Sequence, residues 1–260
     1  MSEKRFYVPP EAIRGGRAVI EGDQAHHLVS VLRKKPGDEI VLFDGQGTEC
    51  TARIERIAHN FVVARIAAKE VHMRTGRPAV GLYVAAPKGK KFDLIVEQAT
   101  ELGADSITPL VTARTVVRLD EASIPTKLER WRRITVAAAK QCRRSTLPQV
   151  NPPVDFLSAA RDLPESAFSI LAWSHGEAAP ILDALSQLTP SHKEIRVLIG
   201  PEGGFTSEET EAARKAAMRF VSLGENVLRT ETAAIASLAA VSQYLDSQRG
   251  RSPSAPEHGD

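Results

Sequence analysis

Residues 195–209 place an apolar run, a glycine-rich turn and a helix-start signal in immediate succession. The apolar run at 195–199 predicts a buried strand that ends at the turn. The turn itself, Gly-Pro-Glu-Gly-Gly at 200–204, stops the strand and leaves backbone N–H groups open to close approach by a ligand. Thr206 followed by Glu209 is the pattern of a capping box, which begins a helix. This order is typical of ligand sites in α/β proteins, and a turn without a ligand is the alternative interpretation.

Two other polar loops follow predicted strands and should lie beside the first. Residues 174–177 follow a predicted strand at 168–173, and residues 224–232 follow another at 219–223. Ligands of open α/β sheets bind at the carboxyl ends of the strands, so the three loops form one candidate site. The chain has no Gly-x-x-x-x-Gly-Lys-Ser/Thr, which disfavours a P-loop nucleotidase. It also has no Gly-x-Gly-x-x-Gly after a first strand, which disfavours a dinucleotide site.

The elements that must position these loops alternate between strand and helix from residue 80 onward. Two further strands are expected at 80–86 and 106–110, and helices at 92–102, 126–144, 210–218 and 232–245. This alternation predicts an α/β fold with a mostly parallel sheet that carries helices on both faces.

The first 72 residues follow a different pattern. Short β-rich runs between glycine, proline and asparagine turns predict a compact, mostly antiparallel barrel with one helix near 24–32. A polar segment at 72–78, broken by glycine and proline, is a candidate linker. Residues 247–260 are rich in Ser, Pro and Gly and are expected to be disordered.

Positive charge is concentrated in one predicted helix. Residues 127–144 carry seven Lys or Arg side chains against one acid, whereas residues 145–246 carry seven basic and thirteen acidic side chains. Such a patch suits a polyanion, of which nucleic acid is the commonest, and a solvated helix face is the alternative.

Composition excludes several classes of protein. The 260 residues are 42% hydrophobic, enough for a sizeable core, and no apolar run is long enough to span a bilayer. The N-terminus lacks the apolar segment of a signal peptide, and two distant cysteines favour a reducing cytoplasm over a disulfide framework. The neighbouring His26 and His27 would point in different directions on a helix, so we expect no metal site.

Several motifs together resemble the RsmE family of 16S ribosomal RNA methyltransferases, which belongs to the SPOUT class. Residues 198–205 (LIGPEGGF) resemble the first signature loop of that family, and residues 223–233 (LGENVLRTETA) resemble its second. Further blocks match in the expected order, namely RFYV at 5–8, LFDG at 42–45, KGKKFD at 88–93, TELG at 100–103, ITP at 107–109 and QCRR at 141–144. The resemblance extends from residue 1 to about residue 246.

The resemblance implies a fold and an activity. It implies a PUA-like β-barrel RNA-binding domain at 1–74 and a SPOUT methyltransferase domain at 75–246 that contains a C-terminal trefoil knot. Knots are rare exceptions to the rules of chain threading, so periodicity alone would not predict one. It further implies S-adenosylmethionine as methyl donor, a homodimer, and methylation of N3 of one uridine in the 16S rRNA of the 30S ribosomal subunit.

Under this resemblance, the three loops would hold the donor through main-chain groups and apolar walls. The expected donor-binding residues are Ala172, His175, Leu198, Ile199, Gly200, Pro201, Gly203, Gly204, Leu223, Gly224, Val227, Leu228 and Thr230.

Methylation at uridine N3 requires removal of the N3 proton or stabilisation of the resulting anion. Arg229 is the candidate for stabilising the anion, because a guanidinium is always charged and offers several fixed donors. Glu202 or Glu231 would accept the proton if desolvation raised its pKa. Structural alternatives stay open: an ion pair between Arg229 and Glu202, and a stabilised place for Glu231 in the first turn of the last helix.

A set of polar and basic residues is assigned to the RNA, with Gln141 a candidate for contact with the target base. This set comprises Arg5, Arg33, Lys88, Lys90, Lys91, Gln141, Arg143 and Arg144. Arg33 equally suits the end of the preceding helix, where positive charge is favourable. Lys140 departs from the family pattern, which has an acidic residue at this position, and the change would alter RNA contacts or the local field.

Two other functions remain open at this stage. In the first, the chain is a SPOUT enzyme that methylates another rRNA position or a ribose 2′-hydroxyl. In the second, it is a non-catalytic RNA-binding protein with a vestigial loop.

Overall fold

A computed structural model describes residues 5–72, 76–87, 89–115, 121–174 and 176–249. The chain divides into two compact units, Met1–Gly76 with Thr135–Leu147, and Arg77–Ile134 with Pro148–Asp260. His175, Lys88 and residues 250–260, to which the sequence analysis assigned roles or disorder, lie outside the described residues.

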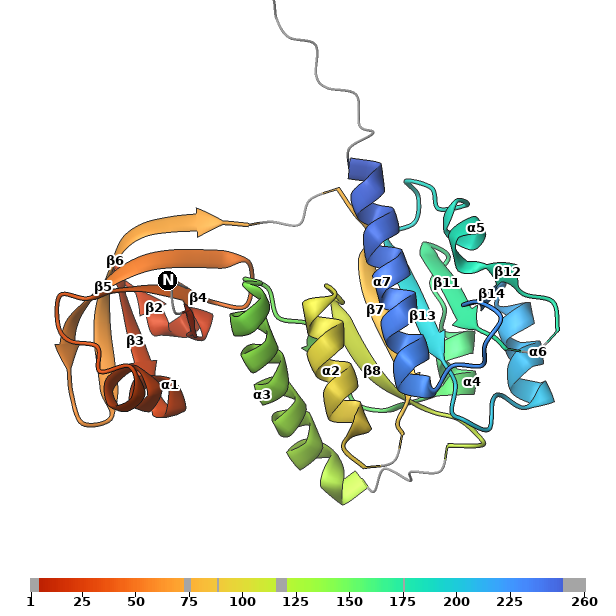
Figure 1. Cartoon of the computed structure of the whole chain (residues 1–260), viewed down its shortest axis with the longest axis horizontal. Helices are drawn as coiled ribbons and strands as arrows, with labels where there is room; N and C mark the ends of the chain where they lie inside the picture. Colours follow the sequence, from red (N-terminus) through yellow and green to blue (C-terminus); the bar gives the residue numbers. More distant parts are fainter. Residues whose placement is uncertain (1–4, 73–75, 88, 116–120, 175, 250–260) are drawn as a thin grey trace, which may run out of the picture. The chain divides into compact units, whose positions relative to one another are not determined.

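The first unit is built on a mixed sheet of six described strands (Figure 1). Along the sheet they are β1 (Arg5–Tyr7), β4 (Glu39–Phe43), β5 (Thr48–Ile57), β6 (Phe61–Val71), β3 (Arg17–Glu21) and β2 (Ile13–Arg14). The β1–β4 pair is parallel and the others are antiparallel. Two register shifts between β5 and β6 bend these long strands, since bulges increase local twist. The bend closes the apolar face around Phe6, Leu42 and Ile54, which are buried.

A short helix covers this core. It starts as α1 (Gly22–His26) and continues as a π-helical turn at His27–Val31, in place of the single helix expected at 24–32. Leu28 on this turn is fully buried, which explains why the helical segment packs against the sheet.

The second unit is an α/β structure, as predicted. Its described strands form one sheet in which every neighbouring pair is parallel. In order along the sheet they are β10 (Val154–Asp155), β8 (Ser106–Val111), β7 (Ala79–Ala85), β13 (Glu194–Ile199), β11 (Ala167–Ala172), β14 (Arg219–Ser222) and β12 (Ala179–Pro180), and β9 (Gln149–Val150) pairs with β8.

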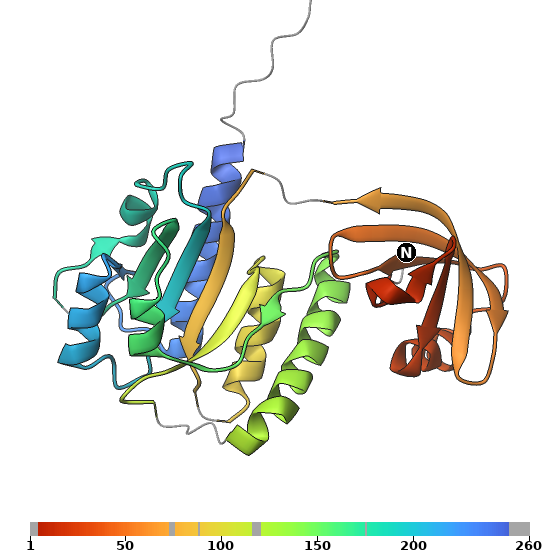
Figure 2. The same cartoon turned by 180° about the vertical axis from the view of Figure 1, so that it is seen from behind.

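Helices cover both faces of this sheet (Figures 1 and 2). The two core clusters place α2 (Lys91–Glu101), α5 (Ile181–Leu185) and α7 (Thr230–Arg249) on one face, and α4 (Phe156–Arg161) and α6 (Ser207–Lys215) on the other. Strand β13 shows why: Val197 and Ile199 join the first cluster, whereas Leu198 joins the second. A strand buried on both faces contains consecutive apolar residues, and in β13 these are the buried residues 197–199.

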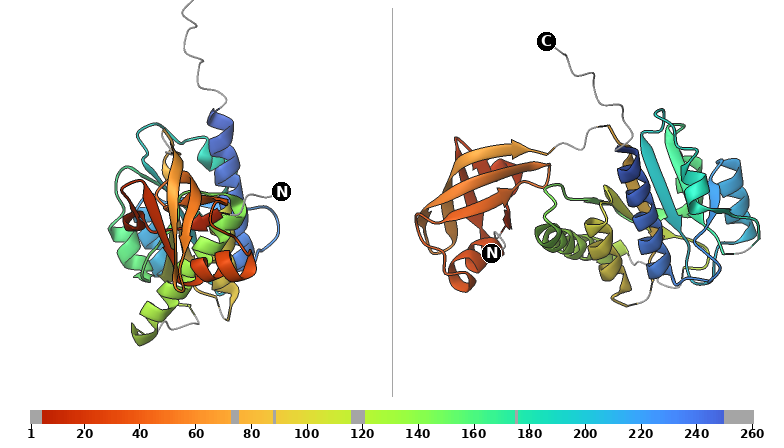
Figure 3. Two further views of the ribbon diagram at one scale, coloured as in Figure 1. Left: turned by 90° about the vertical axis from the view of Figure 1, so that its left-hand side faces the viewer. Right: turned by 45° about the horizontal axis from the view of Figure 1, so that its top comes forward.

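Some elements escaped the sequence analysis. The strands β9, β10 and β12 span two residues each, too short to show a period, and α4 and α5 span six and five. The last helix is longer than expected, because α7 runs to Arg249 and includes three residues of the segment predicted to be a disordered tail. Figure 3 shows α7 running along the sheet beside α2.

The basic helix α3 (Ile124–Cys142) is shared between the units. In its first half Trp131 packs on Phe92 of α2, with 4.4 Å between the ring centroids, and donates a hydrogen bond to Asp93. In its second half, which belongs to the first unit, Lys140 donates to the Gln24 side chain, with 3.1 Å between Nζ and Oε1.

Candidate functional site

A cavity of about 380 Å³ opens at the carboxyl ends of β11, β13 and β14. These three strands are neighbours in the sheet, so the loops that follow them meet at one edge. The first loop follows β11, the second joins β13 to α6, and the third joins β14 to α7. The residues that line the cavity come from these three loops and from the ends of the elements that they join. The three loops therefore lie together, as predicted.

Close packing explains the glycine at the start of the second loop. A Cβ on Gly200 would lie 2.7 Å from Cε2 of Phe205, so any side chain would collide with that ring. Gly204 has a φ of +67° and Gly224 a φ of +122°, values that strain residues with a side chain. Thr230 joins the second and third loops, because its hydroxyl donates to the Gly200 carbonyl at 3.1 Å.

The capping box at the start of α6 is confirmed. The Thr206 hydroxyl accepts a hydrogen bond from the backbone N–H of Glu209, and the Glu209 carboxylate accepts one from the backbone N–H of Thr206. This arrangement sets where the second loop ends and the helix begins.

An aromatic cluster supports the cavity wall. Trp173 and Phe205 both line the cavity, with stacked rings whose centroids are 6.5 Å apart. Phe220 meets Trp173 edge-on at 5.5 Å, and Phe156 packs on Phe205 at 4.8 Å. The tryptophan is the last residue of the apolar run predicted at 168–173, directly before the polar loop, and this position was the available signal for it.

Ten of the expected donor-binding residues line the cavity: Ala172, Ile199, Gly200, Pro201, Gly204, Leu223, Gly224, Val227, Leu228 and Thr230. Leu198 is instead buried in the core cluster on the sheet face that carries α4 and α6, and Gly203 lies against Arg114. Four further lining residues, Ser174, Gly176, Glu225 and Asn226, lie in the predicted site loops but were not assigned to the donor. Five others lie outside those loops and were not assigned to the donor either: Trp173, Ala178, Phe205, Ser222 and Ala233.

The three catalytic candidates occupy different environments. Glu202 is exposed and lines the cavity. Arg229 is also exposed, and it immediately precedes α7, where its carbonyl accepts the N–H of Ala233 at 2.8 Å. Glu231 lies in the first turn of α7, with its side chain 15% exposed, and its Oε1 pairs with Nζ of Lys91 at 2.9 Å.

This ion pair determines the ionisation of Glu231. Burial acts to raise the pKa of Glu231, but hydrogen bonds from Lys91 and the backbone, with the positive charges of Lys91 and Arg229, outweigh it. The pKa of this carboxyl therefore lies below its ordinary value, which makes Glu231 a weaker base. Its other oxygen, Oε2, is buried and has no hydrogen-bond partner among the described residues.

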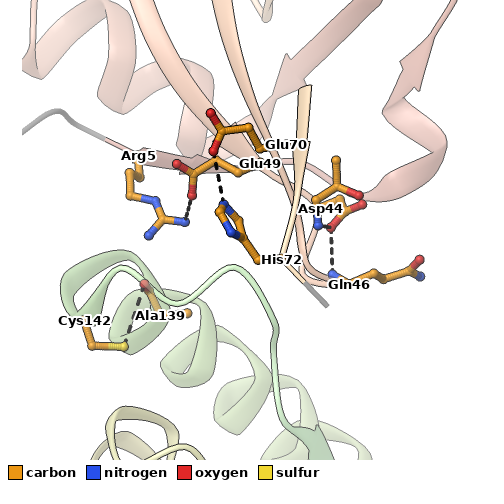
Figure 4. Close-up of polar contacts among 9 residues, drawn as sticks. Arg5, Asp44, Gln46, Glu49, Glu70, His72, Ala139 and Cys142 are labelled. Carbon is orange, nitrogen blue, oxygen red and sulfur yellow. Dashed lines mark hydrogen bonds and ion pairs between the residues drawn. The ribbon is translucent and has the colours of Figure 1, made fainter. Parts of the chain in front are cut away.

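Two residues assigned to the RNA are engaged within the protein. Arg5 is buried, pairs with Glu49 (Figure 4), and places its guanidinium over the Phe43 ring at 5.1 Å. Lys91 pairs with Glu231. These contacts favour structural roles for both side chains.

Other RNA candidates are accessible. Lys90, Arg33, Gln141 and Arg143 are exposed, and Arg144 is half-buried and donates through Nε to the hydroxyl of Thr146 at 2.8 Å. Arg33 and Arg143 both have a left-handed backbone, with φ of 52° and 61°. Such values are uncommon for residues other than glycine.

Lys140, the residue that departs from the family pattern, is half-buried. Its ammonium lies 5.4 Å from the centroid of the Phe6 ring, and it donates to Gln24. Burial lowers the pKa of Lys140. The side chain therefore ties the end of α3 to α1 and β1 within the first unit.

The described residues contain no group of three or more His, Cys, Asp or Glu side chains placed to hold a metal ion. No helix among them is long and apolar enough to cross a membrane.

Family models match both parts of the chain. The RNA methyltransferase domain model matches residues 75–242, and the model of the RNA methyltransferase PUA domain matches residues 20–67. The first match covers most of the second unit and includes all three cavity loops.

Named relatives resemble the chain over almost its full length. Ribosomal RNA small subunit methyltransferase E of Mycobacterium bovis is 32% identical over 239 residues, which are 91% of this chain and 90% of the relative. The protein of the same name from Bacillus subtilis is 30% identical over 236 residues, 89% of this chain and 91% of the relative.

Solved structures agree in fold. A putative methyltransferase of Legionella pneumophila, in complex with the bound cofactor SAM, is 31% identical with a TM-score of 0.83, covering 94% of this chain and 98% of the other. The ribosomal RNA small subunit methyltransferase E of Neisseria gonorrhoeae, bound to S-adenosylmethionine, is 28% identical with a TM-score of 0.79, covering 93% and 98%. Sequence motifs, fold, cavity and relatives agree, and the chain belongs to the ribosomal RNA small subunit methyltransferase E family.

Proposed function

We propose that this protein transfers the methyl group of S-adenosylmethionine to N3 of one uridine in 16S rRNA. The observation that carries the proposal is the cavity formed by the loops after β11, β13 and β14, in a chain whose solved relatives bind S-adenosylmethionine. S-adenosylmethionine is the cofactor of this family, and bound in the cavity it supplies an electrophilic methyl group.

The cavity fits this cofactor in size and chemistry. Its volume of about 380 Å³ is within the range of about 300–1,000 Å³ common for small-molecule sites. Trp173 and Phe205 give it an apolar wall, and the loop backbone supplies N–H and C=O groups for a nucleobase. Glu202 and Glu225 add negative charge to the lining, which suits a cationic ligand.

The residues available for proton chemistry divide into two groups. Glu202 lies on the cavity wall and is our candidate for the group that accepts the N3 proton. Glu231 is disfavoured in this role, because the pair with Lys91 holds its pKa low. We assign Arg229, exposed at the start of α7, to stabilise the negative charge that spreads over the flanking carbonyl oxygens of the uracil.

We further propose how the RNA is held. Arg33, Lys90, Gln141, Arg143 and Arg144 carry accessible donors, and we assign them to the phosphates or bases of the substrate. Contacts of this kind fix the register of the RNA, whereas the cavity edge performs the chemistry on an extruded base.

Three other parts of the proposal extend from the family. We propose that the protein acts as a homodimer, and that it works in the cytoplasm, where small ribosomal subunits are assembled. The trefoil knot of the second unit stays a prediction. Gel filtration with light scattering measures the dimer directly, and a single-subunit mass would contradict it.

A nucleoside analysis tests the reaction. The protein is incubated with 30S subunits from cells that lack this activity and with labelled S-adenosylmethionine, and the rRNA is digested to nucleosides. We expect label in 3-methyluridine. Label in a 2′-O-methylated nucleoside or another methylated base would reject the proposed position, and absence of label together with absence of donor binding in calorimetry would reject the methyltransferase.

A further inference from the structure

A second set of contacts reaches the cavity loop from a different part of the sheet. Strand β8 is separated from β13 by β7, yet the turn at residues 112–115 after β8 contacts the β13–α6 loop. Neither Arg114 nor Glu209, which make these contacts, lines the cavity among the described residues.

Glu209 is the buried half of this connection. Glu209 is only 3% exposed, and its two carboxylate oxygens accept hydrogen bonds from two different segments. Oε1 accepts the N–H of Ala113 at 2.8 Å, and Oε2 accepts the N–H of Thr206 at 2.7 Å. The capping-box residue of α6 therefore also anchors the turn after β8.

Arg114 makes the reciprocal contact. Its Nη1 donates to the carbonyl of Gly203 at 2.8 Å and approaches the carbonyl of Phe205 at 3.5 Å. A Cβ on Gly203 would lie 3.5 Å from Cβ and Cδ of Arg114, which is ordinary van der Waals contact. The arginine thus ties down the glycine-rich part of the loop, which has the greatest conformational freedom.

The turn that carries these groups is itself held in place. Thr112 is buried, and its N–H donates to the Thr115 hydroxyl at 2.9 Å. The two threonine hydroxyls are also 2.9 Å apart, and the N–H of Thr115 returns to the carbonyl of Thr112 at 3.1 Å. A rigid turn can transmit its position to the loop that it contacts.

We infer that Arg114 and Glu209 are positioning residues for the methyl donor, and that they hold the Gly200–Phe205 segment in its binding conformation before the donor arrives. A glycine-rich loop ordered in advance does not lose that freedom on binding, so donor affinity rises. The inference rests on the proposed function, because it takes the cavity as the donor site.

Donor affinity tests the inference, with full-length protein and calorimetry with S-adenosylmethionine. For Arg114→Ala, the loss of charge-assisted hydrogen bonds predicts a Kd about tenfold higher. The rate at saturating donor should change by less than about threefold, because the chemistry at N3 does not use this side chain. Arg114→Lys, which retains one charged donor, should restore part of the affinity.

Glu209→Gln tests the other half of the connection. An amide presents an NH₂ group to one of two backbone N–H donors, so one contact should fail and the Kd should rise by about the same factor. Glu211→Gln is the matched control on the same helix, since Glu211 is exposed and pairs only with Lys215 among the described residues, and we expect its Kd to equal that of the wild type.

Hydrogen–deuterium exchange separates this inference from the proposed function, because it needs no ligand. In Arg114→Ala, amides of residues 203–205 should exchange faster than in the wild type, while those of the sheet should not change. Unchanged exchange, or a Kd equal to that of the wild type, would overturn the inference. Failure of the wild type to bind the donor would instead reject the proposed function.

Discussion

The sequence predicted the placement of the cavity loops more accurately than the placement of the basic side chains. The loops contain glycines whose backbone conformation and close packing leave few alternatives, and ten of thirteen expected residues line the cavity. The basic side chains are long, and their availability depends on which partners the fold brings near. Arg5 and Lys91 form ion pairs with carboxylates of the protein, whereas Arg33 and Arg143 are exposed.

The difference shows that neighbouring residues determine where the backbone requires glycine, whereas they do not determine which partner a charged side chain contacts. A glycine with a left-handed backbone, or one packed under an aromatic ring, indicates the conformation or the close packing required at its own position. A lysine or arginine in the sequence indicates only a positive charge. A carboxylate far away in the chain decides whether that side chain is available to RNA or forms an ion pair within the protein.

The largest expected effect is at Arg229. Replacing it by alanine should reduce methyl transfer at saturating donor by about 10²–10³-fold, because one stabiliser of the developing anion is lost. Donor affinity should stay within about threefold, since Arg229 does not line the cavity among the described residues. Single-turnover assays on 30S subunits together with calorimetry measure both values. If the variant turned over as fast as the wild type, Arg229 would have a structural role, like Arg5, and no role in the reaction.

Next in size is the backbone effect at Gly200. A Cβ 2.7 Å from the Phe205 ring must displace that ring, so Gly200→Ala should lower the free energy of unfolding by about 1–3 kcal/mol and weaken donor binding. Gly203→Ala is the control, because its Cβ would meet Arg114 at an ordinary 3.5 Å and no positive φ is involved. Denaturant unfolding compares the two. Equal stability of the two variants would contradict the packing argument.

The Lys91–Glu231 pair predicts a dependence of stability on pH. Because the pKa of Glu231 is lowered in the folded protein, its ionised form adds stability above the ordinary carboxyl value of 4.5, and this stability is lost as pH falls through the lowered pKa. Glu231→Gln should therefore be less stable than the wild type at pH 7, and the difference should shrink toward pH 3. Melting temperatures across this range measure it, and a difference independent of pH would exclude the ion pair as its source.

The smallest effect compares two helix ends. Arg143 after α3 and Ala217 after α6 both have a left-handed backbone, with φ of 61° and 53°, and in each the following N–H bonds back to a carbonyl five residues earlier. Glycine at either position should raise the free energy of unfolding by about 0.5–1 kcal/mol, because it removes the strain of a side chain there.

Function should separate these two variants. Arg143→Gly should weaken RNA binding and reduce the slope of log affinity against log salt by about one, whereas Ala217→Gly should leave RNA binding unchanged. Filter binding at several salt concentrations measures the slope. Equal slopes for both variants would show that Arg143 does not contact the RNA.

Much of the fold could be predicted from local patterns. Mostly apolar segments of five residues or more, such as 195–199, became the central strands, and the Thr206–Glu209 capping box began α6 where it was expected. Two-residue strands could not be found, because a period needs several residues to show itself. The π-helical turn after α1 was also missed, since the pattern at 24–32 predicts a helix but not the spacing of its hydrogen bonds.

The sequence by itself determined that a polar loop follows each of three strands and that these loops contain glycines, because strand period and turn chemistry are local properties. Tertiary structure decided that the three strands are neighbours, so that the loops meet at one edge of the sheet. Tertiary structure alone decided which charges are engaged, that Trp173 and Phe205 wall the cavity, and that Arg114 reaches Gly203. These contacts join residues far apart in the chain. Their geometry depends on the packing of every element between them, which no local pattern encodes.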